Sequence, residues 1–135
     1  MEAIISRSPN FIHEALMKYN GEIRFGPAYY SLTIDQITFG GRVFGSSYLW
    51  SPNSRYFAVQ EWETTSEERV PQTQLLLIDL ETKQECVLSR AEQGFIVPKK
   101  FENDKLIYTK EYHGQGVTRE FEIEFLNLNR WENLK

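Results

Sequence analysis

Residues 49–62 read LWSPNSRYFAVQEW, two runs of strand-forming residues around a compact polar turn, and this stretch decides the fold class. Pro52 suits a turn position that requires a φ of about −65°, and Asn53 tolerates unusual backbone angles. The aromatic and β-branched residues on both sides favour strands. The stretch therefore predicts a β-hairpin.

Further strands follow this hairpin at a spacing of roughly ten residues. The continuous apolar run in TQLLLIDL (73–80) is typical of a central strand buried on both faces. REFEIEF (119–125) alternates strictly, so its glutamates should share one solvated face. Short turns between such strands predict an antiparallel meander, in one twisted sheet or a small sandwich, with the strand order left open.

The segment SPNFIHEALMKYNG (8–21) predicts one short N-terminal helix. Ser8 would be its N-cap, Pro9 its first residue and Asn20-Gly21 its end. Its apolar residues recur at helical spacing, so the helix should pack on the sheet. The expected fold class is mainly β, in the α+β sense, with this single helix.

The chain has 135 residues, of which 41% are hydrophobic, and we expect one domain spanning residues 1–135. Its N-terminal stretch lacks the basic and long apolar segments of a signal peptide, and no apolar run could span a bilayer. We therefore expect a cytoplasmic protein. The lone cysteine, Cys86, excludes an internal disulfide and a paired-thiol zinc site, and we expect it to be a buried, inert thiol.

Catalytic and cofactor motifs are missing from the sequence. The two histidines, His13 and His113, have no ligand-type residue at metal-binding spacing. No nucleophile elbow surrounds a serine or the cysteine, and the glycine pairs lie between expected strands, where turns explain them. We expect a protein without enzymatic activity, bound metal or cofactor.

The formal net charge is −4, which disfavours nucleic acid as a partner and favours a basic protein. Carboxylates cluster in two places, residues 61–68 and residues 120–124. Trp62 lies between two glutamates, a composition common in binding hot spots, although it could equally be a core residue. Residues 111–113 form a second mixed cluster. The predicted partner-binding residues are Glu61, Trp62, Glu63, Glu67, Glu68, Glu111 and Tyr112.

Residues 49–88, LWSPNSRYFAVQEW followed after a polar insertion by TQLLLIDLETKQECVL, resemble a blade of the TolB-like and WD40-like propellers. In these blades a W-S-P-D/N turn opens one hairpin and an I-D-L-E-T turn opens the next. The chain departs from the pattern at Lys83, where glycine is common, and in the insertion TTSEERVPQ (64–72). The resemblance implies a blade-like meander, but no second copy of the motif is present to build a closed propeller.

FGPAYYSLTID (25–35) followed by LWSPNSRYFAVQEW also looks like the immunity proteins of bacterial contact-dependent inhibition and polymorphic toxin systems. This resemblance implies a non-enzymatic inhibitor that neutralises a cognate toxin in the cytoplasm. Nuclease toxins carry basic clefts, so an acidic inhibitor would imitate phosphate charge. The expected complex is one to one with a monomer, without nucleic acid or membrane.

Two other readings stay open. One is a small-molecule-binding or enzymatic β domain with a cleft between sheet and helix, using Tyr29, Tyr30, His113 and a glutamate. The other is a scaffold subunit whose exposed strand edge pairs with a second copy.

Overall fold

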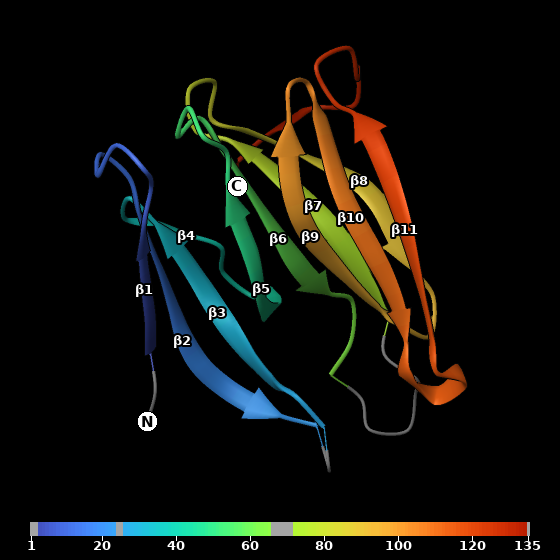
Figure 1. The fold of residues 1–135 in the computed structure, drawn as a ribbon. Helices are drawn as coiled ribbons and strands as arrows, with labels where there is room; N and C mark the ends of the chain where they lie inside the picture. The colour runs from blue at the N-terminus through green and yellow to red at the C-terminus, as the bar shows by residue number, and fades with distance from the viewer. Residues whose placement is uncertain (1–2, 24–25, 66–71, 135) are drawn as a thin grey trace.

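The computed structural model describes residues 3–23, 26–65 and 72–134, and within these ranges the chain consists of antiparallel strands joined by short turns (Figure 1). The one helical piece of the described ranges is the 3₁₀ turn η1, His113–Gln115. The strands are β1 (Ala3–Arg7), β2 (Glu14–Glu22), β3 (Ala28–Ile34), β4 (Ile37–Thr38), β5 (Val43–Trp50), β6 (Tyr56–Trp62), β7 (Thr73–Asp79), β8 (Gln84–Ala91), β9 (Phe95–Glu102), β10 (Lys105–Tyr112), β11 (Val117–Glu124) and β12 (Glu132–Asn133).

The strands form two sheets. The large sheet has the order β1-β2-β3-β5-β6-β7-β8-β12, with β4 paired to β3, and the small sheet has the order β11-β10-β9. Strands that follow one another in the chain are mostly neighbours in a sheet, so the predicted mainly β, antiparallel meander is confirmed. Strand β9 packs against β5, β6 and β7, which places the small sheet over one face of the large sheet (Figure 1).

The predicted N-terminal helix is wrong, because its residues form the β1–β2 hairpin. Ser8 does cap backbone amides, but its hydroxyl accepts the His13 amide across a turn (3.0 Å) and does not start a helix. Phe11 adopts a left-handed φ of 62°, which ends any helical path. From Glu14 onward burial alternates with period two, and Ala15 and Met17 reach the core. Strand pairing therefore overrides the local helix-capping signals.

The hairpin predicted from residues 49–62 is confirmed as β5–β6. Ser51 and Asn53 close its turn, since the Asn53 side-chain oxygen accepts both the Ser51 hydroxyl (2.6 Å) and the Arg55 amide (3.0 Å). Strand β7 lies between β6 and β8 and is buried on both faces, as its apolar run predicted. At Lys83, where propeller blades commonly carry glycine, the backbone has a φ of 59°, a region that favours glycine.

Two apolar cores lie on opposite faces of the β6–β7 pair. The first core joins side chains from β2 and β3 to Phe57 and Leu76, so the large sheet curls around it. A hydrogen bond from Trp50 on β5 to Ser6 on β1 (2.9 Å) closes this curl. The second core lies between the two sheets and contains Leu75. The curl leaves a hollow on the inner face of β6, β7 and β8, and this hollow holds the buried charges.

Candidate functional site

An unusual polar feature of the described residues is a partly buried arginine that joins two strands of the large sheet. Arg42 lies between β4 and β5, just after Gly41, whose positive φ of 72° lets the chain turn inward there. Its guanidinium donates two hydrogen bonds to Glu61 on β6 (2.8 and 3.0 Å) and two to Glu85 on β8 (3.0 and 2.6 Å). The arginine thus spans the strand that separates its two partners.

Both carboxylates are withdrawn from solvent. The side chain of Glu61 is 9% exposed and that of Glu85 is 11% exposed. Gln74 on β7 donates a further hydrogen bond to Glu61 (2.8 Å). Burial opposes the charged form of Arg42, but its hydrogen bonds to the two glutamates outweigh burial and raise the pKa of the guanidinium. The cluster therefore holds one cation and two anions, with a residual charge of one negative.

Strand alternation brings these groups together. Glu61 follows Phe57 and Val59 on the inner face of β6, and Glu85 lies on the same face of β8. The Arg42 guanidinium also lies over the rings of Phe39 and Phe44, 5.3 and 5.8 Å from their centres. Contacts of this kind stabilise a partly desolvated cation.

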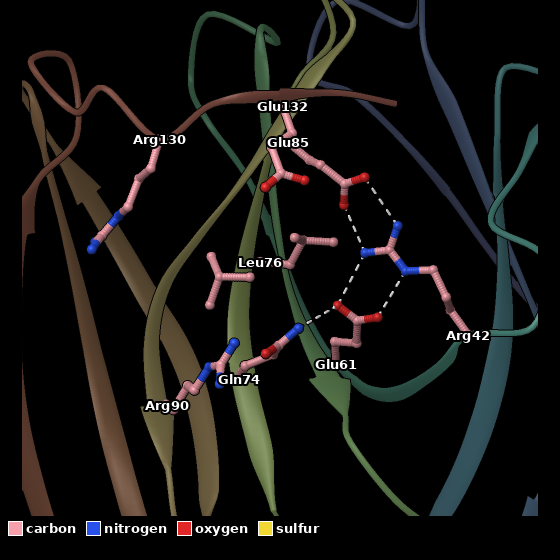
Figure 2. A pocket seen from close by; sticks show the side chains of 9 residues that line it. Arg42, Glu61, Gln74, Leu76, Glu85, Arg90, Arg130 and Glu132 are labelled. Carbon is pink, nitrogen blue, oxygen red and sulfur yellow. Dashed lines mark hydrogen bonds and ion pairs between the residues drawn. The ribbon is translucent and has the colours of Figure 1, made fainter. Parts of the chain in front are cut away.

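The cluster borders a hollow of about 470 Å³, which we call the Arg42 hollow (Figure 2). Figure 2 shows Leu76 on its floor between Arg42 on one side and Arg90 and Arg130 on the other. It is lined by Arg42, Glu61, Gln74, Leu76, Glu85, Val87, Arg90, Arg130 and Glu132. An apolar floor inside a charged rim can accept a small ligand or one side chain of a partner.

The upper rim of the Arg42 hollow places two like charges opposite each other. Glu132 on β12 is the register partner of Glu85 on β8, an arrangement that destabilises a sheet. Of these two carboxylates, the Arg42 guanidinium is hydrogen-bonded to Glu85. Of the other two arginines, Arg130 donates to the Leu88 carbonyl oxygen (3.2 Å), so it is partly engaged by the backbone.

Two of the predicted partner-binding residues are buried. Glu61 lies against Arg42, and its side chain is largely withdrawn from solvent. Trp62 is 5% exposed and packs between Tyr29 and Phe95, with ring centres 5.6 and 5.8 Å away. The alternative that Trp62 is a core residue is confirmed. The next residue, Glu63, is exposed.

Glu63 lies at the edge of a second hollow of about 620 Å³, which shares Arg42 and Glu61 with the first. Its carboxylate is 3.8 Å from the Arg90 guanidinium. Glu67 and Glu68 lie outside the described residues. Among the described carboxylates of residues 61–68, Glu63 is therefore the one that reaches solvent.

Glu111 and Tyr112 lie at the end of β10 in the small sheet. Glu111 is hydrogen-bonded by Thr109 (3.1 Å), and its carboxylate lies 3.7 Å from the Lys99 ammonium. Its register partner is Phe95, which also contacts Trp62. The clusters predicted at residues 61–68 and 111–113 are therefore connected through the ring of Phe95. Trp62 is inside the protein, however, and Glu111 faces outward.

The cleft proposed for a small molecule between sheet and helix is also wrong, since the described residues contain no α-helix beside the sheet. Tyr29 and Tyr30 are adjacent on β3 and point to opposite faces, so both cannot line one cleft. Tyr30 belongs to the first core and Tyr29 packs on Trp62. His113 lies against Phe95, with ring centres 5.3 Å apart.

The carboxylates that cluster at residues 120–124 are exposed. On β11, Phe121 and Ile123 face the second core, while Glu120, Glu122 and Glu124 face solvent. They share the outer face of the small sheet with side chains of β9 and β10. We call this surface the acidic face; its charged residues are Lys99, Lys100, Glu102, Lys105, Glu111, Glu120, Glu122 and Glu124.

Sequence reasoning missed Arg42 and Glu85. One signal was available, because strict alternation on β6 places Glu61 on the same face as Phe57 and Val59. A carboxylate in such a row requires a buried cation, and an arginine is the usual partner. The identity of that arginine depends on strand order, which the sequence left open.

No family model, curated protein or solved structure matches this chain. In the described ranges, no group of three or more histidine, cysteine, aspartate or glutamate side chains is arranged to hold a metal ion. No helix in the described part of the chain is long and apolar enough to cross a membrane.

Proposed function

We propose that this protein is a non-enzymatic, immunity-type inhibitor that binds and neutralises a cognate protein toxin with a basic surface. It acts in the cytoplasm and binds one partner molecule per chain. The observation that carries the proposal is the acidic face, where three glutamates project to solvent from alternate residues of one strand.

Strand geometry fixes the spacing of these carboxylates. Residues two apart on a strand are separated by about 6.8 Å, so Glu120, Glu122 and Glu124 form an evenly spaced row. Glu122 lies 3.6 Å from the Lys105 ammonium, a surface pair that contributes little stability. In the described part of the chain, no hydrogen bond or ion pair engages the carboxylates of Glu120 and Glu124.

The row supports a binding role better than a structural one. Like charges repeated along one strand repel each other and add nothing to the fold. The same charges produce a negative potential that attracts a basic partner and speeds association. Across the acidic face there are five carboxylates and three lysines, so the excess of negative charge is local and does not depend on the rest of the chain.

The test is a comparison of two charge-matched variants as bait in a bacterial lysate at low salt. The site variant carries Glu120→Gln, Glu122→Gln and Glu124→Gln. The control variant carries Glu14→Gln, Glu22→Gln and Glu81→Gln, three exposed carboxylates on other strands and turns. We expect wild type and control to retain one basic protein that elutes as salt rises, and the site variant to lose it.

The retained protein must then meet a functional criterion. Expressed alone, it should arrest bacterial growth, and co-expression with wild type or control should restore growth while the site variant should not. Equal retention by both variants would exclude the acidic face. A captured protein that has no toxic activity would refute the immunity role, whatever its affinity.

A second candidate function is the binding of a small ligand in the Arg42 hollow, favoured by its apolar floor and its charges of both signs. A ligand present at one hundred times its dissociation constant adds about 2.7 kcal/mol to the free energy of unfolding. A thermal-shift screen of metabolites is therefore expected to find a stabilising compound if this function is correct. A screen without a hit would leave the protein-binding role as the better explanation.

A further inference from the structure

The two sheets end in four strand edges, and three of them carry features that prevent pairing with another strand. Strand β11 is strongly charged, with Arg119 and three glutamates. Strand β9 contains Pro98 and a register shift next to it. Strand β12 has only two residues. Charges, proline, bulges and short length are the devices by which natural sheets protect their edges.

The fourth edge, β1, has the fewest of these devices. Its sequence AIISR contains no proline, its one charged residue is the terminal Arg7, and its register with β2 runs without a bulge. At its centre Ile5 is 63% exposed, although burial of an isoleucine is strongly favourable. An edge strand without a bulge and with an exposed apolar side chain is a template for another strand.

Exposed apolar side chains concentrate on the same hairpin. Among the described residues, four large hydrophobic side chains are exposed, and three of them, Ile5, Phe11 and Ile12, belong to β1 or to the turn that follows it. The turn is rigid, because Asn10 accepts hydrogen bonds from Ser8 and from the Ile12 amide (2.7 and 3.0 Å). This hairpin is therefore a preorganised, apolar part of the surface.

We propose that β1 pairs with β1 of a second copy of this chain, antiparallel and about a two-fold axis at Ile5. In this register Ile5 faces Ile5 of the second copy, and Ala3 faces Arg7. No like charges oppose each other, and each isoleucine covers the other. A two-fold axis requires a strand that is complementary to itself, and AIISR meets this requirement.

The dimer joins the two large sheets into one continuous sheet. Strands β1 and β11 lie on opposite sides of the molecule, so the acidic face of each chain remains open (Figure 1). The proposal does not rest on the immunity function. It replaces the monomer that was expected from the sequence, and leaves one partner site on each chain.

The register can be tested by oxidative cross-linking of the full chain. Facing residues of antiparallel strands have Cα atoms roughly 4.5–5.5 Å apart, a separation that suits a disulfide. Ile5→Cys should therefore give a covalent dimer under mild oxidation. In Ala3→Cys, on the same face of the same strand, the two thiols would lie four residues apart along the pair, and we expect little cross-linking. The native Cys86 is buried, so its background should be low.

Sedimentation velocity over a wide concentration range gives the second measurement. We expect wild type to be a dimer, and Ile5→Lys to raise the dissociation constant at least about tenfold, because two ammonium groups would replace an apolar contact. Leu126→Lys, at a 51% exposed position outside the hairpin, is the matched control and should dimerise like wild type. Circular dichroism should show that both variants are folded.

A wild type that sediments as a monomer throughout, or an Ile5→Lys variant that dimerises unchanged, would overturn the proposal. Equal cross-linking of the Ile5→Cys and Ala3→Cys variants would overturn the register. Selective cross-linking through Ile5→Cys together with a weakened Ile5→Lys dimer supports both.

Discussion

Replacement of Arg42 by methionine is expected to lower the free energy of unfolding by about 3–5 kcal/mol, the range found when one partner of a buried ion pair is removed. Methionine keeps most of the side-chain volume over Phe39 and Phe44, so the loss isolates the charge. It would leave Glu61 and Glu85 about nine-tenths buried with no cation between them.

Both carboxylates accept two hydrogen bonds from the same guanidinium, so the variant loses four charge-assisted bonds at once. Glu61 retains only the amide of Gln74 among the contacts of this cluster.

Urea unfolding followed by tryptophan fluorescence measures the effect. The triple variant Arg42→Met, Glu61→Gln and Glu85→Gln should regain at least about half of the loss, since replacement of a whole buried ion cluster is often neutral. Arg90→Met is the matched control, because Arg90 lines the same hollow but is 62% exposed and should cost less than about 1 kcal/mol.

A loss of less than about 1 kcal/mol in Arg42→Met would show that water solvates the two carboxylates and would refute the reasoning from burial. A triple variant as unstable as the single one would show that the arginine acts through packing.

Three further predictions concern the remaining polar and tight contacts. Burial alone would raise the pKa of Asp79, but hydrogen bonds from Arg55 and from turn amides lower it. The lowered pKa contributes free energy of unfolding that is fully present above the unfolded pKa of about 3.9 and is lost as the pH falls through the lower folded pKa. Asp79→Asn should cost about 2 kcal/mol at neutral pH and flatten acid unfolding curves below pH of about 4. Gly45→Ala should cost about 1–3 kcal/mol in urea unfolding, because its Cβ would overlap the side-chain oxygen of Gln60; an unchanged midpoint would refute the tight packing. Burial raises the pKa of the Cys86 thiol, so a thiol reagent should modify it only after unfolding, and rapid labelling of folded protein would contradict this.

The parts of the fold that the sequence predicts are those decided by local periodicity. Residues within a single segment predict the β5–β6 turn, the burial of β7 on both faces and the solvated outer face of β11. The N-terminal helix failed for the opposite reason. Residues 11–16 fit a helical stripe, but pairing of β2 with β1 and β3 selects the strand from Glu14 onward.

The candidate site was harder to predict because it depends on strand order. Glu61 and Glu85 are 24 positions apart in the numbering, and only their placement on either side of β7 lets one arginine reach both. Within a cluster of charged residues, the sequence alone does not show which carboxylates are buried and which are exposed. The cluster at residues 61–68 and that at 120–124 look alike in the sequence, yet Glu61 is internal and Glu120 is solvent-facing.

This difference decides which charges a partner meets. The charge of Glu61 is offset inside the protein by Arg42 at hydrogen-bonding distance, so it contributes little to the outer field. Glu120 and Glu124 have no such counter-ion in the described part of the chain, and their field extends into solvent over about one Debye length, roughly 8–10 Å. Association with a basic partner should therefore depend on salt through β11, and neutralising Glu61 should change stability without changing that dependence.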